Sequence, residues 1–266
     1  ADAVVDGNIG VFSQGNLTGS YRSGGDISLS SAANINASVN AAGGFADTSN
    51  GDVPTAGNAF VDAAGSVALT NSSAAGMFGI NGQSVSVTNA TAGEDMLVLS
   101  QSTANLSGIT VGDDLDVRAP GVITANGASA TGLGPDGFLL YYSSSAGFTI
   151  GQGEGSSSLD GSDINLQSSA ASINASGLSA GDDILLTAAT TIALNGGTTL
   201  GLGITGGDSS IRTTGGDTTL SGLNAFSDVV VAANGTANIT GAVRAGNDVI
   251  VNANAVTLAD IPSSGD

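Results

Sequence analysis

The sequence predicts an all-β protein, a right-handed parallel β-helix (β-solenoid) with about 20 residues per coil and roughly 13 coils. Three observations predict it: a short phrase that recurs along the chain, a second apolar–polar alternation halfway between its copies, and an unusual composition. Glycine contributes 42 of the 266 residues, and aromatic residues only 4%. Small aliphatic side chains fill a narrow tube, and glycine supplies the left-handed conformations of its corners.

The recurring phrase places a glycine turn and an aspartate before a short apolar strand. Residues 180–188 read AGDDILLTA, and residues 245–253 read AGNDVIVNA. Related phrases occupy 24–30, 92–100, 111–119 and 161–167. Successive aspartates of the phrase are 19, 49, 20, 45 and 20 residues apart, at Asp95, Asp114, Asp163, Asp183, Asp228 and Asp248. A unit of about 20 residues with some enlarged copies is typical of a solenoid.

Each copy contains two short segments with the period-2 alternation of half-buried strands. The first follows the aspartate directly, and the second follows half a period later, as in NINAS at 34–38 and SINAS at 172–176. In the first strand we expect Ser28, Asp116 and Asn165 to face outward. The inward positions are predicted to be Ile27 and Leu29, Leu115 and Val117, Ile164 and Leu166, and Val249 and Val251.

We expect a single rod over 1–266, with loops or enlarged coils at 43–60 and 131–160. These two stretches contain prolines and runs of turn-forming residues that interrupt the period. Within 62–90 the half-period leaves open which of Val67, Met77 and Val85 belong to first strands and which to second strands.

The charge and the missing residue types exclude several classes of function. There are 23 acidic residues against four arginines, for a net charge of -19, and lysine, histidine, cysteine and tryptophan are absent. The chain therefore lacks an imidazole base, a thiol nucleophile, a lysine for Schiff-base chemistry and the His/Cys ligands of zinc. An acidic surface repels the phosphate backbone, so we expect no nucleic-acid binding. No apolar run reaches the length of a membrane span.

The phrases AGDDILLTA, AGNDVIVNA and VGDDLDVRA resemble the repeats of filamentous-haemagglutinin-like large exoproteins of the two-partner secretion type. The resemblance covers most of residues 16–260 and is strongest at 92–130 and 159–258. It implies a long β-helical shaft that is exported from a Gram-negative cell and serves adhesion, aggregation or biofilm formation. Autotransporter passengers share this architecture.

The aspartates offer two alternatives to a purely structural role. Asp113-Asp114 and Asp182-Asp183, at Gly-Asp-Asp corners, could collect calcium, which prefers oxygen ligands. Asp114 and Asp116 could share one face and cleave a glycosidic bond as an acid pair. The simpler interpretation is that each aspartate accepts backbone N–H bonds at its corner and stays solvated. We therefore assign no catalytic, cofactor-binding or metal residue.

Two surface patterns bear on binding. The adjacent threonines at 190–191, 198–199 and 218–219 would point to opposite faces, which argues against an ice-binding ladder. Four aliphatic residues fall at outward positions and could contact another rod or a covering segment: Leu97, Leu185, Val230 and Ile250. The sequons, including Asn36 and Asn174, reflect corner composition.

The sequence thus predicts a non-enzymatic, extracellular structural or adhesive β-solenoid, secreted or held at the bacterial cell surface. Open solenoid ends carry unpaired strand edges, which favour end-to-end association or continuation into further repeats. The expected partners are other copies of the chain or further repeats, lateral neighbours, and surface glycans or proteins. The alternative is a β-helical carbohydrate-active enzyme that uses carboxylates.

Overall fold

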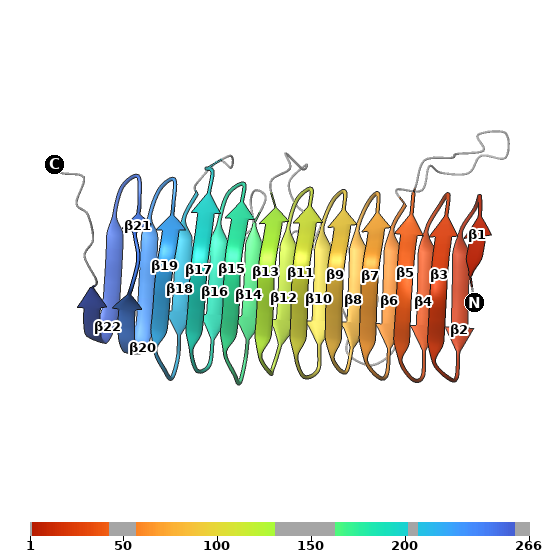
Figure 1. The fold of residues 1–266 in the computed structure, drawn as a ribbon, viewed down its shortest axis with the longest axis horizontal. Coiled ribbons are helices and arrows are strands. Elements are labelled where there is room, and N and C mark those ends of the chain that lie inside the picture. Colours follow the sequence, from red (N-terminus) through yellow and green to blue (C-terminus); the bar gives the residue numbers. More distant parts are fainter. Residues whose placement is uncertain (1, 43–56, 131–162, 202–206, 259–266) are drawn as a thin grey trace, which may run out of the picture.

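The computed structural model describes residues 2–42, 57–130, 163–201 and 207–258. Within these ranges the chain is all-β, without a helix, and its 22 strands form one sheet in which every pairing is parallel. The strands stack as a β-solenoid of about 11 turns with ~19 residues per turn (Figure 1). At the usual strand spacing the stack is about 50 Å long.

Each coil starts with a short strand of five residues, and these strands form one column of parallel pairs. In the last two described coils the short strand continues into the second, as β20 (Val229–Ile239) and β22 (Val249–Leu258). The earlier members are β2 (Ile9–Ser13), β4 (Ile27–Ser31), β6 (Ala59–Ala63), β8 (Phe78–Gly82), β10 (Met96–Ser100), β12 (Leu115–Ala119), β14 (Ile164–Ser168), β16 (Ile184–Ala188) and β18 (Ser209–Thr213).

The second column is formed mostly by longer strands, of seven or eight residues. From Val67 onward most of these have a bend in their middle, where a residue adopts a left-handed conformation, as Asn71, Asn89 and Gly108 do. The bend lets the strand bury two residues on each side of it. The column contains β1 (Ala3–Val5), β3 (Leu17–Ser23), β5 (Ile35–Ala41), β7 (Val67–Ala74), β9 (Val85–Ala92), β11 (Ala104–Val111), β13 (Ile123–Ala130), β15 (Ile173–Ala180), β17 (Ile192–Thr199), β19 (Thr218–Asn224) and β21 (Val243–Arg244).

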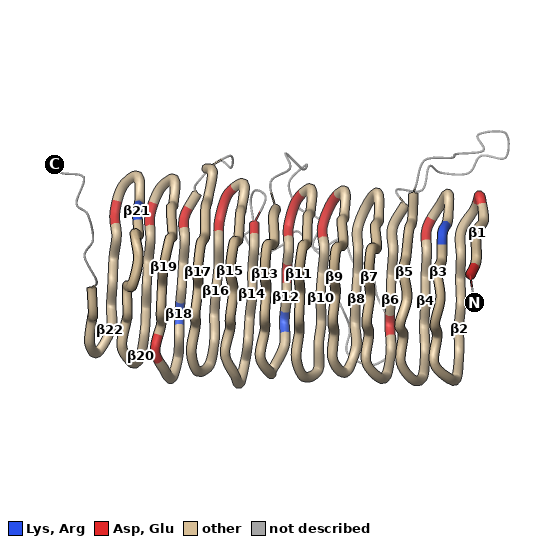
Figure 2. The backbone as a smooth tube through the Cα atoms, in the orientation of Figure 1, with Lys and Arg blue, Asp and Glu red and all other residues tan. Residues whose placement is uncertain are grey.

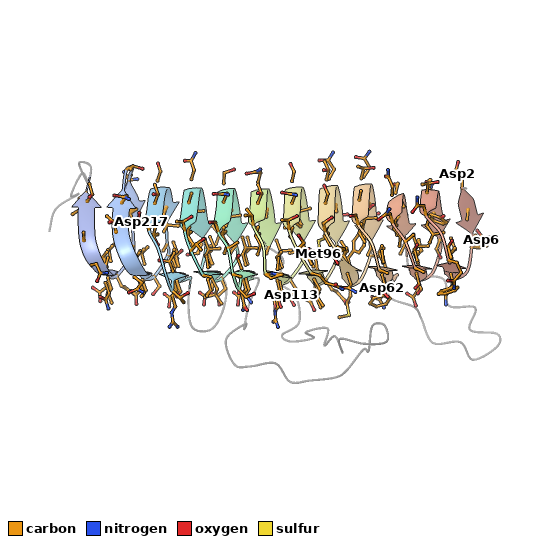
Figure 3. All side chains as sticks on the ribbon, turned by 90° about the horizontal axis from the view of Figure 1, so that it is seen from below. Asp2, Asp6, Asp62, Met96, Asp113 and Asp217 are labelled. Atoms are coloured by element: carbon orange, nitrogen blue, oxygen red, sulfur yellow. The ribbon has the colours of Figure 1, made fainter. Side chains whose placement is uncertain are left out.

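The core is a continuous column of inward aliphatic side chains, and Met96 lies in it between the walls of strands (Figure 3). The predicted inward pairs of β4, β12 and β14 are buried, which confirms that part of the prediction. Val249 is 44% exposed and Val251 half-buried. These two belong to the last described coil, which has a neighbour on one side only.

Of the three residues predicted to face solvent, Ser28 is exposed. The prediction is wrong for Asp116 and Asn165, which are buried although their register is the outward one. Asp116 stacks beside Leu97 of the preceding coil, which is also buried. Outward-register side chains of β10, β12 and β14 are therefore buried as well.

The spacing of the corners explains why there are about 11 turns and not 13. Most corners repeat after 18 to 20 residues, but three intervals are longer. Asp26 and Asn58 are 32 residues apart, Asp114 and Asp163 are 49 apart, and Asp183 and Asp208 are 25 apart. The predicted insertion at 43–60 lies mostly outside the described residues, but its end belongs to β6, which begins at Ala59. The insertion at 131–160 lies entirely outside them.

The assignment left open within 62–90 is settled by the strand register. Val67 and Val85 begin β7 and β9, which are second strands. Met77 directly precedes the first strand β8.

Candidate functional site

The corner before each short strand carries a ladder of side-chain hydrogen bonds between coils. In most coils the backbone N–H of the corner residue donates to the Oδ1 atom of the corner residue one coil earlier, as Asp163 does to Asp114 at 3.0 Å and Asp183 to Asp163 at 2.8 Å. The same bond joins Asp248 to Asp228 at 3.0 Å. Because every coil must satisfy this N–H, an aspartate or asparagine at the corner fixes the position of the next coil.

The ladder has more members than the recurring phrase indicated. Asn8 and Asn58 hold the same position near the N-terminus, and Met77 interrupts the side-chain series. Asp208 is a further member, in bonds with Asp183 and Asp228. The sequence interpretation overlooked Asp208 because its coil is longer, although the Gly-Gly-Asp before an alternating segment marks it.

The middle of the ladder is buried. Burial raises the pKa of Asp95 to about 7, and the pKa of Asp114 and of Asp163 to about 8 each, because the charged carboxylate loses its hydration. Nearby carboxylates raise these pKa values further, while the ladder N–H bonds lower them. The expectation that corner aspartates accept N–H bonds is confirmed, and the expectation that they stay solvated is wrong for these three.

Three carboxylates meet at the corner before β14 and β16. Asp163, Asp182 and Asp183 each place one oxygen within 4.8 Å of the oxygens of the other two. Asp163 and Asp182 are completely buried, and Asp183 is half-buried. The Oδ1 atoms of Asp182 and Asp183 accept the N–H groups of Gly207 and Asp208, at 2.6 and 2.7 Å.

The two predicted calcium corners differ in the number of carboxylates that surround them. Asp182-Asp183 belongs to the three-carboxylate group, and Asp163 from the preceding coil completes it. Asp113-Asp114 belongs to no such group among the described residues. Sequence reasoning could not join Asp163 to Asp182-Asp183, because stacking of coils and not proximity along the chain brings them together.

The predicted acid pair is engaged with protein partners. Asp114 accepts the ladder bond from Asp163, and both it and Asp116 are buried. Asp116 forms an ion pair with Arg118 at 2.6 Å and accepts a hydrogen bond from the Asn165 amide at 3.2 Å. Burial raises the pKa of Asp116, while Arg118 opposes that shift. These contacts account for both carboxyl groups structurally.

Most acidic residues of the described ranges lie along one edge of the rod, where the ladder corners lie, and the arginines are scattered (Figure 2). Several acidic residues of neighbouring coils therefore lie one strand spacing apart. Such a stripe repels phosphates and other acidic rods and attracts cations.

The outward aliphatic residues differ in their surroundings. Leu97 is 5% exposed and thus covered within the chain, and Leu185 is half-buried. Val230 and Ile250 stack on each other in adjacent coils and are 36% and 51% exposed. They form a small apolar surface near the C-terminal end.

The threonine and sequon interpretations are also resolved by the register. Thr198 pairs with Asn224, and Thr219 with Ala193, so these threonines do not stack into a ladder. Asn36 and Asn174 lie exposed within β5 and β15, and not at corners as predicted.

Comparison of the chain with protein-family models, with curated proteins and with solved structures finds no match. The described part of the chain also contains no helix that is long and apolar enough to span a membrane. The function must therefore be argued from the geometry.

Proposed function

We propose that the chain is a non-enzymatic structural rod, a shaft segment of an extracellular or cell-surface assembly that associates end to end through its coils. The observation that carries the proposal is the incomplete core layer of the last described coil. Val249, Val256 and Leu258 occupy inward positions and are 44%, 46% and 56% exposed. The residues beneath them, such as Val229 and Ile239, are buried.

The strand edges lead to the same conclusion. Among the described residues, β22 pairs only with β20, and at the other end β1 pairs only with β3. Each end thus presents unpaired backbone groups beside apolar side chains, and both are satisfied when another parallel coil stacks there. Contact of one end with the opposite end of a second copy is a head-to-tail interface, which generates open filaments.

The acidic edge supports a rod that associates along its axis. Carboxylates on neighbouring rods repel each other, which opposes side-by-side packing along that edge. Val230 and Ile250 form a small exposed apolar surface through which two rods could contact each other laterally. A shaft of this kind would hold its binding surfaces away from the cell. Surface glycans or proteins of host or bacterial cells are the further partners that we propose for these surfaces.

The test measures assembly against concentration by sedimentation velocity, with negative-stain electron microscopy of the same samples. We expect linear particles whose length increases with concentration. Leu258→Asp places a charge at an inward position of the exposed layer and should reduce the association. Thr257→Asp is the matched control, because Thr257 is exposed and faces outward on the same strand. A wild-type chain that remains monomeric at all concentrations, or equal loss in both variants, would contradict the proposal.

A further inference from the structure

The three-carboxylate group at the corner before β14 and β16 is a built site and not a patch of surface charge. It joins two consecutive coils, because Asp163 stands one coil before Asp182-Asp183, and the ladder bond from the Asp183 N–H to Asp163 Oδ1 fixes their relative position. A second fixed contact follows in the next coil, where the Gly207 N–H donates to Asp182 Oδ1.

One oxygen of this group points to a ligand. Asp163 is 0% exposed, and while its Oδ1 atom accepts the Asp183 N–H, its Oδ2 atom is buried and has no hydrogen-bond partner. A buried carboxylate oxygen without a partner is costly, and it is rare in folded proteins unless an ion or a proton satisfies it. Asp163 also has oxygens of two further carboxylates, those of Asp182 and Asp183, within 4.8 Å of one of its own, and a cation would balance the charge of all three.

We propose that Asp163, Asp182 and Asp183 bind a calcium ion that ties the two coils together. Calcium takes oxygen ligands at 2.3–2.6 Å, so two oxygens on opposite sides of the ion are about 4.6–5.2 Å apart. The three carboxylate oxygens lie within 4.8 Å of one another, which places all of them in reach of one such ion. This site does not depend on the proposed rod function.

Calcium fits the site better than magnesium does. Magnesium keeps several of its waters and demands near-ideal octahedral geometry, whereas calcium exchanges water for protein oxygens and tolerates irregular geometry. Two of the three ligands are completely buried, and all three are fixed by corner hydrogen bonds. Asp183 is half-buried, so the ion and its remaining waters approach the site from the side of this residue.

The experiment uses the whole chain, freed of metal with a chelator and dialysed. Isothermal titration calorimetry with calcium chloride, and separately with magnesium chloride, measures binding. Thermal melting followed by circular dichroism, with and without calcium at constant ionic strength, measures stabilisation. We expect one saturable calcium site per chain, with a Kd on the order of 10⁻⁴ M as in extracellular calcium modules, weaker magnesium binding, and a rise in Tm with calcium.

The variant Asp163→Asn keeps the oxygen that accepts the ladder bond and removes the charge. It should weaken calcium binding about tenfold or more, because the ion loses one of three charged ligands, and abolish the rise in Tm. Asp228→Asn is the matched control: Asp228 holds the same ladder position, but it lies outside the group. Should Asp163→Asn fail to fold by circular dichroism, Asp183→Asn replaces it.

Three results would overturn the proposal: no saturable calcium binding by the wild type, equal binding of calcium and magnesium, or unchanged affinity in Asp163→Asn. The first would leave a proton as the partner of the buried oxygen. The second would indicate general attraction of cations to the acidic edge.

Discussion

The middle and the C-terminal stretch of the aspartate ladder make the same hydrogen bond in different surroundings. Asp95 and Asp114 accept the N–H of the next coil while buried. Asp208 and Asp228 accept the same bond at 3.0 Å while half-exposed. The hydrogen bond is shared, and the exposure of the carboxyl group differs.

This difference separates two properties of the corner aspartate: its hydrogen bond to the next coil and the energetic cost of its charge. The hydrogen bond depends on the backbone geometry of the corner, which most coils reproduce. The energetic cost of the negative charge depends on how much water the carboxylate retains. Burial of the carboxylate reduces that hydration. The ladder bond therefore positions coils in both stretches, and in the middle the buried carboxylates also lose hydration.

The largest expected difference between the two stretches lies in their cores. Leu115→Ala, in the middle, removes a side chain that is 0% exposed and should cost about 2–5 kcal/mol, because it loses buried apolar area and leaves a cavity. Leu258→Ala, in the last described coil, changes a side chain that is 56% exposed and should cost about 0.5 kcal/mol or less. Chemical denaturation at low protein concentration measures both.

Concentration provides the control for this pair. If copies stack on the last coil, Leu258 becomes buried, and the cost of Leu258→Ala should increase with protein concentration while that of Leu115→Ala stays constant. Equal costs for the two substitutions at low concentration would contradict the contrast between the buried middle and the open end.

The next prediction concerns pH. Burial raises the pKa of Asp95 from 3.8 to about 7, and the charges of Asp113 and Glu94 add to the shift. Between these pH values the folded chain retains a proton that the unfolded chain has lost. The free energy of unfolding should therefore fall as pH rises from about 4 to 7, by up to about 1.4 kcal/mol per pH unit for such a carboxyl, and stay low above pH 7.

The measurement is Tm against pH in the presence of a chelator, which removes any effect of metal. The wild type should melt at a higher temperature at pH 5 than at pH 8. Asp95→Asn should reduce this dependence and raise Tm at pH 8. A wild-type Tm that rises from pH 5 to pH 8 would show that the middle carboxylates are not destabilised by burial.

Much of this architecture could be predicted from the sequence. The period of the Gly-Asp phrase and the period-2 alternation predicted the stacked parallel strands, and they identified Ile27, Leu115 and Ile164 as inward residues, because each coil repeats the same local requirement. The aspartate before the first strand also indicated a corner that accepts backbone N–H bonds, which Asp183 and Asp228 do.

What the sequence could not supply depends on contacts between distant parts of the chain. The alternation gives Asp116 an outward register, but burial of that face depends on what covers it. The grouping of Asp163 with Asp182-Asp183 depends on which corners stack, and the 25-residue interval to Asp208 hid one ladder member. Local patterns predict the coil, whereas cover and stacking determine the site.

The smallest expected effect isolates the ladder bond itself, in the stretch where the carboxylate is partly solvated. Asp228→Asn keeps an oxygen that accepts the Asp248 N–H and should leave stability nearly unchanged. Asp228→Ala removes that acceptor, and the N–H must find water or remain unsatisfied, so we expect a loss of about 0.5–1.5 kcal/mol. Denaturant midpoints of the two variants, measured beside the wild type at pH 8, give the difference.

The same pair of substitutions at Asp95 should give a different order, and that order tests the comparison most directly. At pH 8 Asp95→Asn should exceed the wild type in stability, because it keeps the acceptor for the Asp114 N–H and removes a buried charge. Asp95→Ala should fall below Asp95→Asn by the value of the lost bond. If Asp95→Asn were instead no more stable than the wild type, burial would not be what distinguishes the two stretches, and the ladder would be uniform along the rod.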